Sequence, residues 1–479
     1  MVDLGWDDAA DVVIVGGGGA GMRAALAAAK EGSDVLLLEK MSHPGGKTAM
    51  SIGIITASET AYQKKAGVKD SHAKHFADLA AMAKAAGQKL DVPATKFMIR
   101  ECSKEVEALN ALGVKFTGPH PEGPHGTPRM HVIQPDCRTM AEVLVKACKK
   151  AKVRILCDMP GAELVLDTKG QVVGVRADGP DGPRHIQAKA VVLAAGDYSA
   201  NTDLVKKVAP KLKLAEPLRA FATGDGHRMA MRIGAATRNM HRVNTPHMRF
   251  PGWPHVEPSP GLVGAGAVLV DGNGKRIKTE LDESVLLPGF EDRWEDIFIV
   301  IDKKTAAKLA QPSDDVGPGR DGWVRTGKPF IGTAPKVGYA YLEDCKTWQW
   351  HHETRSLAAA ARHIKCTTSA LEKSLGKGSE GPYHILGPVR RVLANSGGGV
   401  STNYDLNVIN TEGKPIKGLF GAGVNARLIT FMGGHGYAFA WAMASGRIAG
   451  GNAGKYAKTV RRYGGGTTSN QQRIDKSST

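Results

Sequence analysis

The chain has 479 residues, of which 42% are hydrophobic and 23% are charged, proportions typical of a soluble protein with two or three domains. Its formal net charge is +17, yet no aromatic residues alternate with the basic clusters, which argues against nucleic-acid binding. No uninterrupted apolar run is long enough to span a membrane and the amino terminus is acidic, so we expect a cytoplasmic protein without a signal peptide or membrane span.

The segment DVVIVGGGGAGMRAALAAAKEGSDVLLLEK, residues 11–40, predicts a strand, a tight turn, a helix and a second strand. Gly16, Gly18 and Gly21 fit the GxGxxG pattern, and Glu39 follows at the distance expected of a ribose-binding acid. The first glycine permits the turn, the second lets a pyrophosphate approach the helix terminus, and the third allows close packing of helix and strand. The sequence therefore predicts a dinucleotide site.

The next segment, KMSHPGGKTAMSIGIITAS, carries a second glycine pair at Gly45-Gly46 directly after the ribose acid. A second cradle at this position suits a long cofactor whose isoalloxazine ring lies beyond the phosphates, which favours FAD. An NAD dehydrogenase would instead continue into another βα unit, and no second GxGxxG unit for a nicotinamide cofactor follows.

Later segments strengthen this interpretation. They are KAVVLAAGDYSAN (189–201), TGDGHRMAMRIGA (223–235), AVLVDGNGKRIKTE (267–280), GKPIKGLFGAGVNA (413–426) and GRIAGG (446–451). With these motifs in this order, the chain resembles the flavoprotein family of fumarate reductase, succinate dehydrogenase and 3-ketosteroid dehydrogenase over nearly its whole length. The resemblance implies an α/β protein, with a discontinuous Rossmann-like FAD-binding domain and an inserted α+β capping domain.

In this family the capping domain binds the substrate. We expect the FAD-binding domain to comprise residues 1–244 and 386–460, the cap residues 245–385, and a flexible tail residues 461–479. The motifs and the resemblance together predict the FAD contacts, which are Gly16, Gly18, Ala20, Gly21, Glu39, Lys40, Gly46, Lys47, Thr48, Ser51, Gly53, Gly161, Ala195, Gly196, Asp225, Gly423, Val424, Gly436, Ala438 and Phe439.

The stretch GGHGYAFAWAMASGRIAGG, residues 433–451, predicts a buried helix with a glycine-rich entry. By resemblance, this helix points its N-terminus at the pyrimidine end of the flavin, where it would stabilise the negative charge of the reduced form. Plain core packing is the alternative, and one helix can serve both roles. His43 does not match the spacing of the histidine that attaches flavin in respiratory members, so we expect non-covalent FAD.

The chain departs from fumarate reductases at their dicarboxylate ligands. Asn395-Ser396 replace the usual His-Thr pair of HTMGG, the usual closing arginine falls near Gly433, and the usual histidine of HPT falls near Pro246. The glutamate that follows the closing Ala-Gly of the family falls on Val424. These differences argue against succinate or fumarate as the substrate.

Flavin chemistry at a C–C bond requires a hydride path to flavin N5, a proton donor or acceptor at the α-carbon, and donors for the carbonyl or carboxylate. The catalytic candidates lie at the return from the cap and at the final helix entry, and are Tyr383, Arg390, Arg391, His435 and Tyr437. The alternatives are a solvated pair or salt bridge for the two arginines, and packing beside the flavin for Tyr437. Further candidates are His384, Arg427, His247, Arg249, His351, His352 and Arg355, although HHETR is more typical of a polar surface segment.

The loop TGPHPEGPHGTPRMH contains His120, His125 and His131. Their spacing is irregular and interrupted by glycine and proline, so we expect no metal site there. The family position of the loop implies instead that it approaches the flavin.

We therefore expect an FAD-dependent oxidoreductase that desaturates or reduces a C–C bond α,β to a carbonyl or carboxylate, on a cyclic ketone or ring acid. The six cysteines form no CxxC motif, which favours free thiols, so electrons should pass to or from an external carrier such as a quinone, a redox protein or oxygen. The alternatives are a flavin-dependent oxidase or hydroxylase, and a flavin-binding redox subunit without its own substrate.

Overall fold

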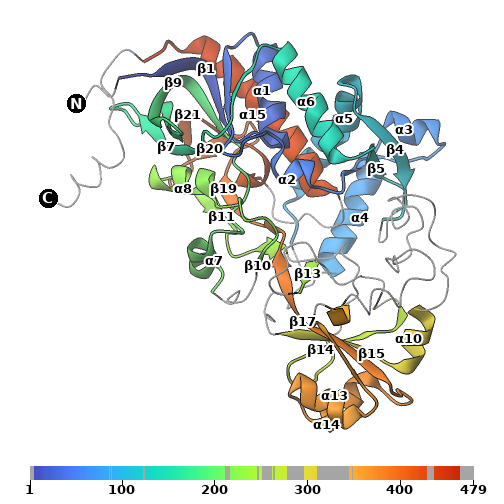
Figure 1. The fold of residues 1–479 in the computed structure, drawn as a ribbon. Coiled ribbons are helices and arrows are strands. Elements are labelled where there is room, and N and C mark those ends of the chain that lie inside the picture. The colour runs from blue at the N-terminus through green and yellow to red at the C-terminus, as the bar shows by residue number, and fades with distance from the viewer. Residues whose placement is uncertain are drawn as a thin grey trace.

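The computed structural model describes residues 5–85, 87, 89–121, 125–210, 216–244, 247–250, 262, 265–277, 296–309, 345–347, 349–428 and 436–463. The described elements form two bodies (Figure 1). The larger contains the first and last parts of the chain, and the smaller, at the bottom of the view, is built from its middle.

Eight strands form the main sheet of the larger body. Strand β1 (Asp8–Val15) pairs in parallel with β2 (Val35–Leu38) on one side and with β9 (Gly182–Leu193) on the other. Residues 12–14 are fully buried, as expected for a parallel strand covered on both faces. The other strands complete the order β20-β21-β9-β1-β2-β6 with an antiparallel β7-β8 extension on β9, and they are β6 (Arg154–Leu156), β7 (Gly161–Leu166), β8 (Val172–Gly179), β20 (Asn407–Ile409) and β21 (Pro415–Gly421).

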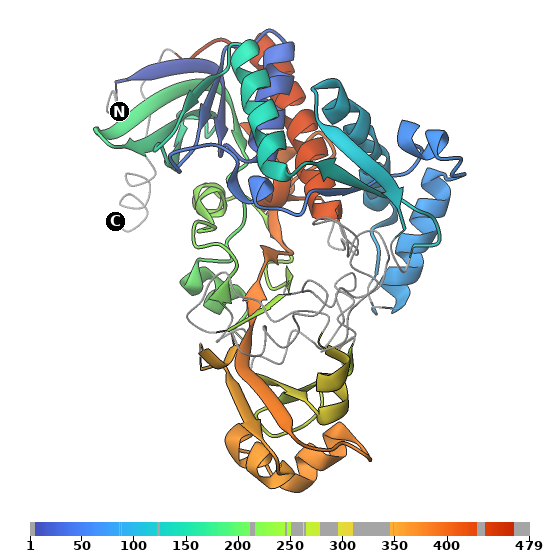
Figure 2. The same ribbon diagram turned by 45° about the vertical axis from the view of Figure 1, so that its right-hand side comes forward.

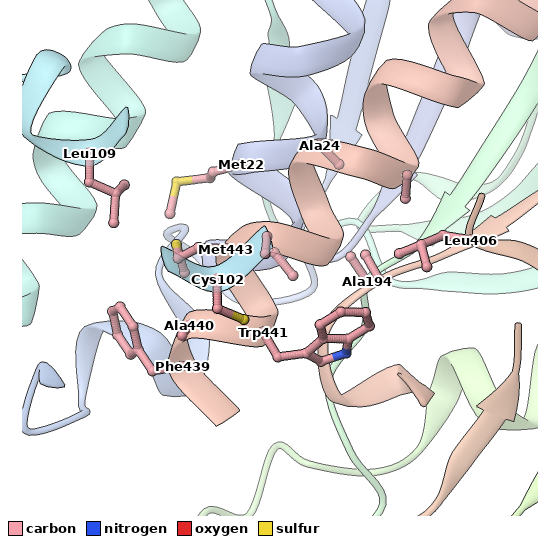
Figure 3. Close-up of a cluster of buried hydrophobic side chains, with 14 of the residues drawn as sticks. Met22, Ala24, Cys102, Leu109, Ala194, Leu406, Phe439, Ala440, Trp441 and Met443 are labelled. Atoms are coloured by element: carbon pink, nitrogen blue, oxygen red, sulfur yellow. The ribbon is translucent and has the colours of Figure 1, made fainter. Parts of the chain in front are cut away.

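The first and the last long helices of this body lie side by side. Helix α1 (Gly19–Lys30) follows β1, and α15 (Tyr437–Thr459) packs along it in both views (Figure 1, Figure 2). Figure 3 shows Met22 of α1 and Met443 of α15 meeting in the buried cluster between them. Strand β21 also pairs in parallel with β9, so segments far apart in the sequence share one sheet and one core.

A repeat of glycines explains how closely the two helices approach. Gly446 and Gly450 lie one helical turn apart on α15, and a Cβ on either would overlap a carbonyl oxygen of α1, that of Ala20 or that of Ala24. Gly454 continues the repeat, where a Cβ would lie 2.8 Å from the Cβ of Glu31. Glycine at these positions therefore lets the two backbones touch.

A buried ion network ties the same two helices to α5 (Val92–Ala111). Arg23 of α1 donates to one oxygen of Glu105 at 2.8 Å, and Arg447 of α15 donates to the other at 2.6 Å. Arg447 also donates to Glu101 at 3.1 Å. Because the Glu105 side chain is fully buried, its two arginine partners are essential to keep its charge satisfied.

Acid should weaken this network at Glu101. Burial raises its pKa, but hydrogen bonds from Lys104, Arg447 and Arg100 outweigh burial and hold the pKa at about 2, below the ordinary 4.5. A carboxylate with a depressed native pKa stabilises the fold above its unfolded pKa, and loses this effect as the pH falls through its native pKa. We expect the free energy of unfolding to fall from pH 4.5 to about 2, and Glu101→Gln to flatten that decline in urea titrations. Identical pH profiles for both proteins would contradict this role.

The larger body contains further elements on either side of β9 in the sequence. Those from the first part of the chain are α2 (Gly46–Ala49), β3 (Ile54–Thr56), α3 (Ala61–Lys65), α4 (His72–Ala85), β4 (Lys115–His120), β5 (Met130–Gln134) and α6 (Cys137–Lys150). Those that follow β9 are α7 (Thr202–Val208), β10 (Glu216–Pro217), α8 (Asp225–Arg232), β11 (Thr237–Arg238), β12 (Val243–Asn244), β13 (His247–Arg249), β18 (Asn395–Ser396), β19 (Gly399–Ser401), the 3-10 helix Gly423–Asn425 and β22 (Ala426–Arg427).

One long strand joins the two bodies. Residues 384–389 of β17 (Tyr383–Leu393) pair with the cap strand β15 (Ile297–Ile301), and residues 390–392 pair with β13 (Figure 1, Figure 2). The predicted boundary between residues 385 and 386 falls within this strand, and the division into domains stays a prediction. The other cap elements are β14 (Val268–Asp271), α10 (Lys303–Leu309), β16 (His351–Thr354), α13 (Leu357–Ile364) and α14 (Thr368–Leu375).

All six cysteines are free thiols, as expected. Within the part of the chain that the structure describes, no helix combines the length and the apolar character needed to cross a bilayer. Cytoplasmic location stays a prediction, and the tail predicted at 461–479 lies almost wholly outside the described residues.

Candidate functional site

The first glycine turn leads from β1 into α1. Gly16 has φ +106°, and a Cβ there would lie 2.5 Å from the carbonyl oxygen of Ala194. A Cβ on Gly21 would overlap the carbonyl oxygen of Gly16. At Gly18 the nearest protein atom would lie 4.0 Å from a Cβ, so protein packing does not require glycine there. This is the position at which the sequence predicts the approach of a pyrophosphate.

The N-terminus of α1 has the properties of an anion site. Its N-cap, Gly18, makes no side-chain cap bond, and its first turn has no acidic residue, so no acid of the helix itself offsets its dipole. The second glycine pair borders this terminus, since the amide of Gly45 donates to the carbonyl of Gly17 at 3.0 Å. The Gly19 amide donates to the hydroxyl of Thr48 at 3.1 Å. The two glycine-rich segments that the sequence predicts to bind the cofactor are therefore in direct contact.

Glu39 lies beside the same turn, at the end of β2. Its carboxylate accepts hydrogen bonds from the amides of Gly17 and Met41, both at 2.8 Å. A carboxylate has about four acceptor positions, so two remain for ribose hydroxyls. The fixed orientation of Glu39 fits the ribose-binding role that the sequence predicts.

The two lysines near these cradles have protein partners. Lys40 donates to Thr223 at 2.7 Å and to Asp225 at 2.9 Å, which links β2 to the entry of α8. Lys47 donates to Asp197 at 2.6 Å, and its other two acceptors are Ser199 at 3.1 Å and the carbonyl of Ala394 at 2.8 Å. Because an ammonium has three donors, Lys47 is saturated by the protein and holds α2 against β9 and the end of β17.

Two glycines from the last part of the chain, Gly423 and Gly436, pack closely against α1 and β3. Gly423 has φ +67°, its amide donates to Ser445 at 2.8 Å, and a Cβ there would lie 2.9 Å from that of Ala20. Gly436 precedes α15 with φ +82°, and a Cβ there would lie 2.8 Å from the amide nitrogen of Thr56. The segments around Gly423 and Gly436 are therefore in close contact with α1 and β3, respectively.

Helix α15 has no side-chain cap and no acid in its first turn. Its intrahelical bonds begin with the amide of Ala440, which donates to Gly436 at 2.8 Å. The amides of Ala438 and Phe439 precede that bond, where a flavin carbonyl is expected. The residues present therefore fit FAD.

Other predicted FAD contacts divide into two groups. Gly53 and Gly161 have packing reasons to be glycine, because a Cβ would lie 2.8 Å from Cys137 Sγ or 2.7 Å from a methyl group of Val15, respectively. At Gly196, with φ +78°, a Cβ would meet no atom within 4 Å. The contacts of Gly46, Ser51, Ala195, Asp225 and Val424 with FAD stay predictions.

Two catalytic candidates at the return from the cap, Tyr383 and Arg390, have partners within the protein. Tyr383 lies in the hydrophobic core of the cap and donates to the carbonyl of Ser379 at 3.0 Å. Arg390 forms an ion pair with Asp296 at 3.0 Å. The side chain of Arg391 and all of His435 lie outside the described residues. The chemical roles of these residues stay predictions.

Tyr437 is buried at the start of α15 within a polar cluster that the sequence did not predict. Its hydroxyl forms a short hydrogen bond with Nε2 of His75 and lies 3.5 Å from Nε2 of His125. The other ring nitrogen of His75 lies 3.0 Å from the hydroxyl of Ser58. Burial, together with the charges of Arg129 and His125, holds the pKa of His75 well below 6.5, so it is neutral at pH 7. The loop containing His125 therefore reaches the helix entry, in keeping with the expectation that it approaches the flavin.

The cluster is held by a buried arginine. Arg129 donates to both carboxylate oxygens of Asp70, at 2.7 and 2.8 Å, and also to Asp78. His131, the third histidine of the loop, lies 2.8 Å from the hydroxyl of Thr60. These hydrogen bonds fix the Arg129 and His131 side chains.

Tyr437→Phe should destabilise the protein, because it leaves His75 Nε2 buried without its partner. An unsatisfied buried polar group costs about 1–3 kcal/mol. We expect the free energy of unfolding in urea to fall by about that amount. Tyr404→Phe is the matched control, since Tyr404 exposes 44% of its surface. Equal stabilities of the two variants would contradict a supporting role for the Tyr437 hydroxyl.

Comparison with known proteins identifies the family. A family model described as FAD binding domain matches residues 11–302. An NADH:fumarate oxidoreductase of Klebsiella pneumoniae (strain 342) is 28% identical over 434 residues, which cover 88% of this chain but only 45% of that protein. A fumarate reductase (cytochrome) of Shewanella frigidimarina is 27% identical, with 94% of this chain and 78% of that protein covered.

A solved structure shares the fold. The 3-ketosteroid delta1-dehydrogenase from Sterolibacterium denitrificans, in complex with 1,4-androstadiene-3,17-dione, matches with a TM-score of 0.72 at 18% identity, covering 95% of this chain and 100% of that one. The predicted α/β fold, a discontinuous nucleotide-binding domain with an inserted cap, and the FAD cofactor are confirmed. The chain belongs to the FAD binding domain family and is an FAD-dependent oxidoreductase of the fumarate reductase-like type.

Proposed function

We propose that this protein transfers hydride between FAD and a C–C bond that is α,β to a carbonyl or carboxylate. Bound FAD supplies a hydride donor or acceptor at N5. The observation that carries the proposal is the uncapped, glycine-led N-terminus of α15, which packs against β3 and α1. A helix terminus at this place favours the negative charge of a reduced flavin.

The chain's own residues have separate tasks in this proposal. The uncapped start of α1 holds the pyrophosphate, and Glu39 orients the ribose by accepting hydrogen bonds from its hydroxyl groups. The amides of Ala438 and Phe439 hold the pyrimidine edge. We assign proton transfer at the substrate α-carbon to the predicted candidates as a group, which are Tyr383, Arg390, Arg391, His435 and Tyr437.

The substrate that we propose is a cyclic ketone or ring acid rather than succinate or fumarate. Where fumarate reductases have a His-Thr pair, Asn395 and Ser396 pair with β12 in this chain. The Ser396 hydroxyl donates to the carbonyl of Gly398 at 3.1 Å, and the Ser396 carbonyl accepts from Arg427. This segment therefore offers no imidazole for a dicarboxylate. The net charge of +17 favours approach of an anionic ring acid.

The electron partner that we propose is an external carrier, namely a quinone, a redox protein or oxygen. The sequence carries no CxxC or CxxCH motif that would hold an iron–sulfur cluster or haem. The chain also lacks a second dinucleotide signature for direct reduction by a nicotinamide. Electrons would therefore reach FAD from outside this chain.

An anaerobic reoxidation screen tests the proposal. Photoreduced holoprotein is mixed with cyclohexenone, a cyclohexenone carboxylate, 4-androstene-3,17-dione or fumarate, and the visible band of oxidised flavin is followed. We expect a cyclic enone to reoxidise the flavin at least about tenfold faster than fumarate, a difference of about 1.4 kcal/mol in barrier. Faster reoxidation by fumarate would contradict the substrate class. Reoxidation by oxygen alone would favour an oxidase.

A further inference from the structure

Three side chains with metal-binding atoms converge at the edge of the cap sheet. His351 and Glu353 are two residues apart on β16, so they project from the same face of the strand. His384 of β17 lies directly opposite Glu353 in the antiparallel register. Each of the three offers one ligand atom, and these atoms all lie within 4.8 Å of one another.

The distances within this cluster suit a common ion. Nε2 of His351 lies 2.9 Å from Nδ1 of His384, which in turn lies 3.9 Å from a carboxylate oxygen of Glu353. Two imidazole nitrogens bound to one zinc ion at 2.0–2.1 Å in tetrahedral geometry are about 3.3 Å apart. The two nitrogens would therefore need to separate by only a few tenths of an ångström, a shift within the reach of side-chain rotation.

The cluster is accessible from solvent. The His384 side chain is 14% exposed and that of Glu353 is 50% exposed, so an ion can enter from solvent.

We infer that His351, Glu353 and His384 form a binding site for one divalent transition-metal ion of the zinc class. Two imidazoles and one carboxylate are the ligands that zinc prefers, whereas magnesium and calcium prefer oxygen ligands alone. Water would fill the remaining position. Such an ion ties β16 to β17, the strand that continues from the cap into the larger body, and so stiffens the connection between the two (Figure 2).

Zinc titration of chelator-treated holoprotein tests this inference. We expect one saturable equivalent of zinc by isothermal titration calorimetry, and a rise in the unfolding midpoint on its addition. His351→Gln and His384→Asn should each abolish both effects, and Glu353→Gln should weaken affinity about tenfold or more, as loss of one ligand costs at least about 1.4 kcal/mol. Cobalt(II) in place of zinc should give a visible d–d spectrum that the variants lack.

His352→Gln is the matched control. His352 is the neighbour of His351 on the opposite face of β16, where its ring stacks on His363 at 4.1 Å between centroids. This variant should bind zinc as the parent protein does. Zinc binding that is absent from the parent, or equal in the His384→Asn and parent proteins, would overturn the inference. Should either histidine variant fail to fold, the Glu353→Gln and His352→Gln comparison decides, and equal affinities of that pair would also overturn it.

Discussion

Gly21→Ala should yield a folded protein that purifies without flavin. Its new Cβ would overlap the carbonyl oxygen of Gly16, a backbone atom inside the first glycine turn. The turn would have to open, which moves the start of α1 away from the pyrophosphate position. The measurement is the amount of FAD released by heating, per mole of purified chain. We expect the ratio to fall from near one to near zero.

Gly272→Ala is the control for this loss, because a Cβ at Gly272 in the cap would meet no atom within 4 Å. It should retain full FAD content. Circular dichroism of the Gly21→Ala protein, with and without added FAD, separates loss of the cofactor from loss of the fold. A yellow Gly21→Ala protein with parental FAD content would show that this turn does not hold the dinucleotide.

Alanine should also have opposite effects at two neighbouring glycines of α15. At Gly450 its Cβ would overlap the carbonyl oxygen of Ala24 and force α1 and α15 apart. At Gly451 the Cβ would meet no atom within 4 Å. Overpacking a tight contact costs about 1–3 kcal/mol or more, whereas alanine in an open helical position gains up to about 1 kcal/mol over glycine.

Urea unfolding followed by circular dichroism measures this contrast. We expect the unfolding midpoint to fall for Gly450→Ala and to rise or stay unchanged for Gly451→Ala. The FAD content of Gly450→Ala should fall as well, because the shift carries the starts of both helices away from the cofactor. Equal midpoints for the two variants would contradict the close approach of α1 and α15.

The sequence was sufficient to predict the parts of the site that depend on local turn geometry. The GxGxxG pattern predicts glycine at positions 16 and 21. At each position a Cβ would collide with a backbone atom that lies close in sequence or follows the adjoining strand β9. The glycine entry to the last helix was predictable for the same reason. Family resemblance then supplied the expectation that two distant segments share one cofactor.

The partners of charged and polar groups were not predictable in the same way. Lys47 was expected to contact FAD, and the structure gives it Asp197 and Ala394, which lie 150 and 347 residues away. The pairing of Tyr437 with His75 spans 362 residues. No local pattern encodes such contacts, since they depend on how the helices pack.

The three proposed metal ligands also could not be predicted from the sequence, because they come together only through strand pairing. His351 and Glu353 are visible in HHETR, but two ligands on an exposed strand do not distinguish a metal site from a polar edge. Only strand register places His384 opposite Glu353. From the sequence, metal binding was considered only at the histidines of residues 120–131 and none was expected there, so the sequence did not point to this triad.

The central claim is that FAD is held jointly by the N-termini of α1 and α15. A crystal structure of the purified yellow holoprotein tests it most directly. We expect the pyrophosphate at the start of α1, between Gly16 and Gly21, and the pyrimidine edge of the flavin within hydrogen-bonding distance of the Ala438 or Phe439 amide. A flavin whose ring lies away from the start of α15, or a protein that crystallises without FAD after saturation with it, would contradict the account.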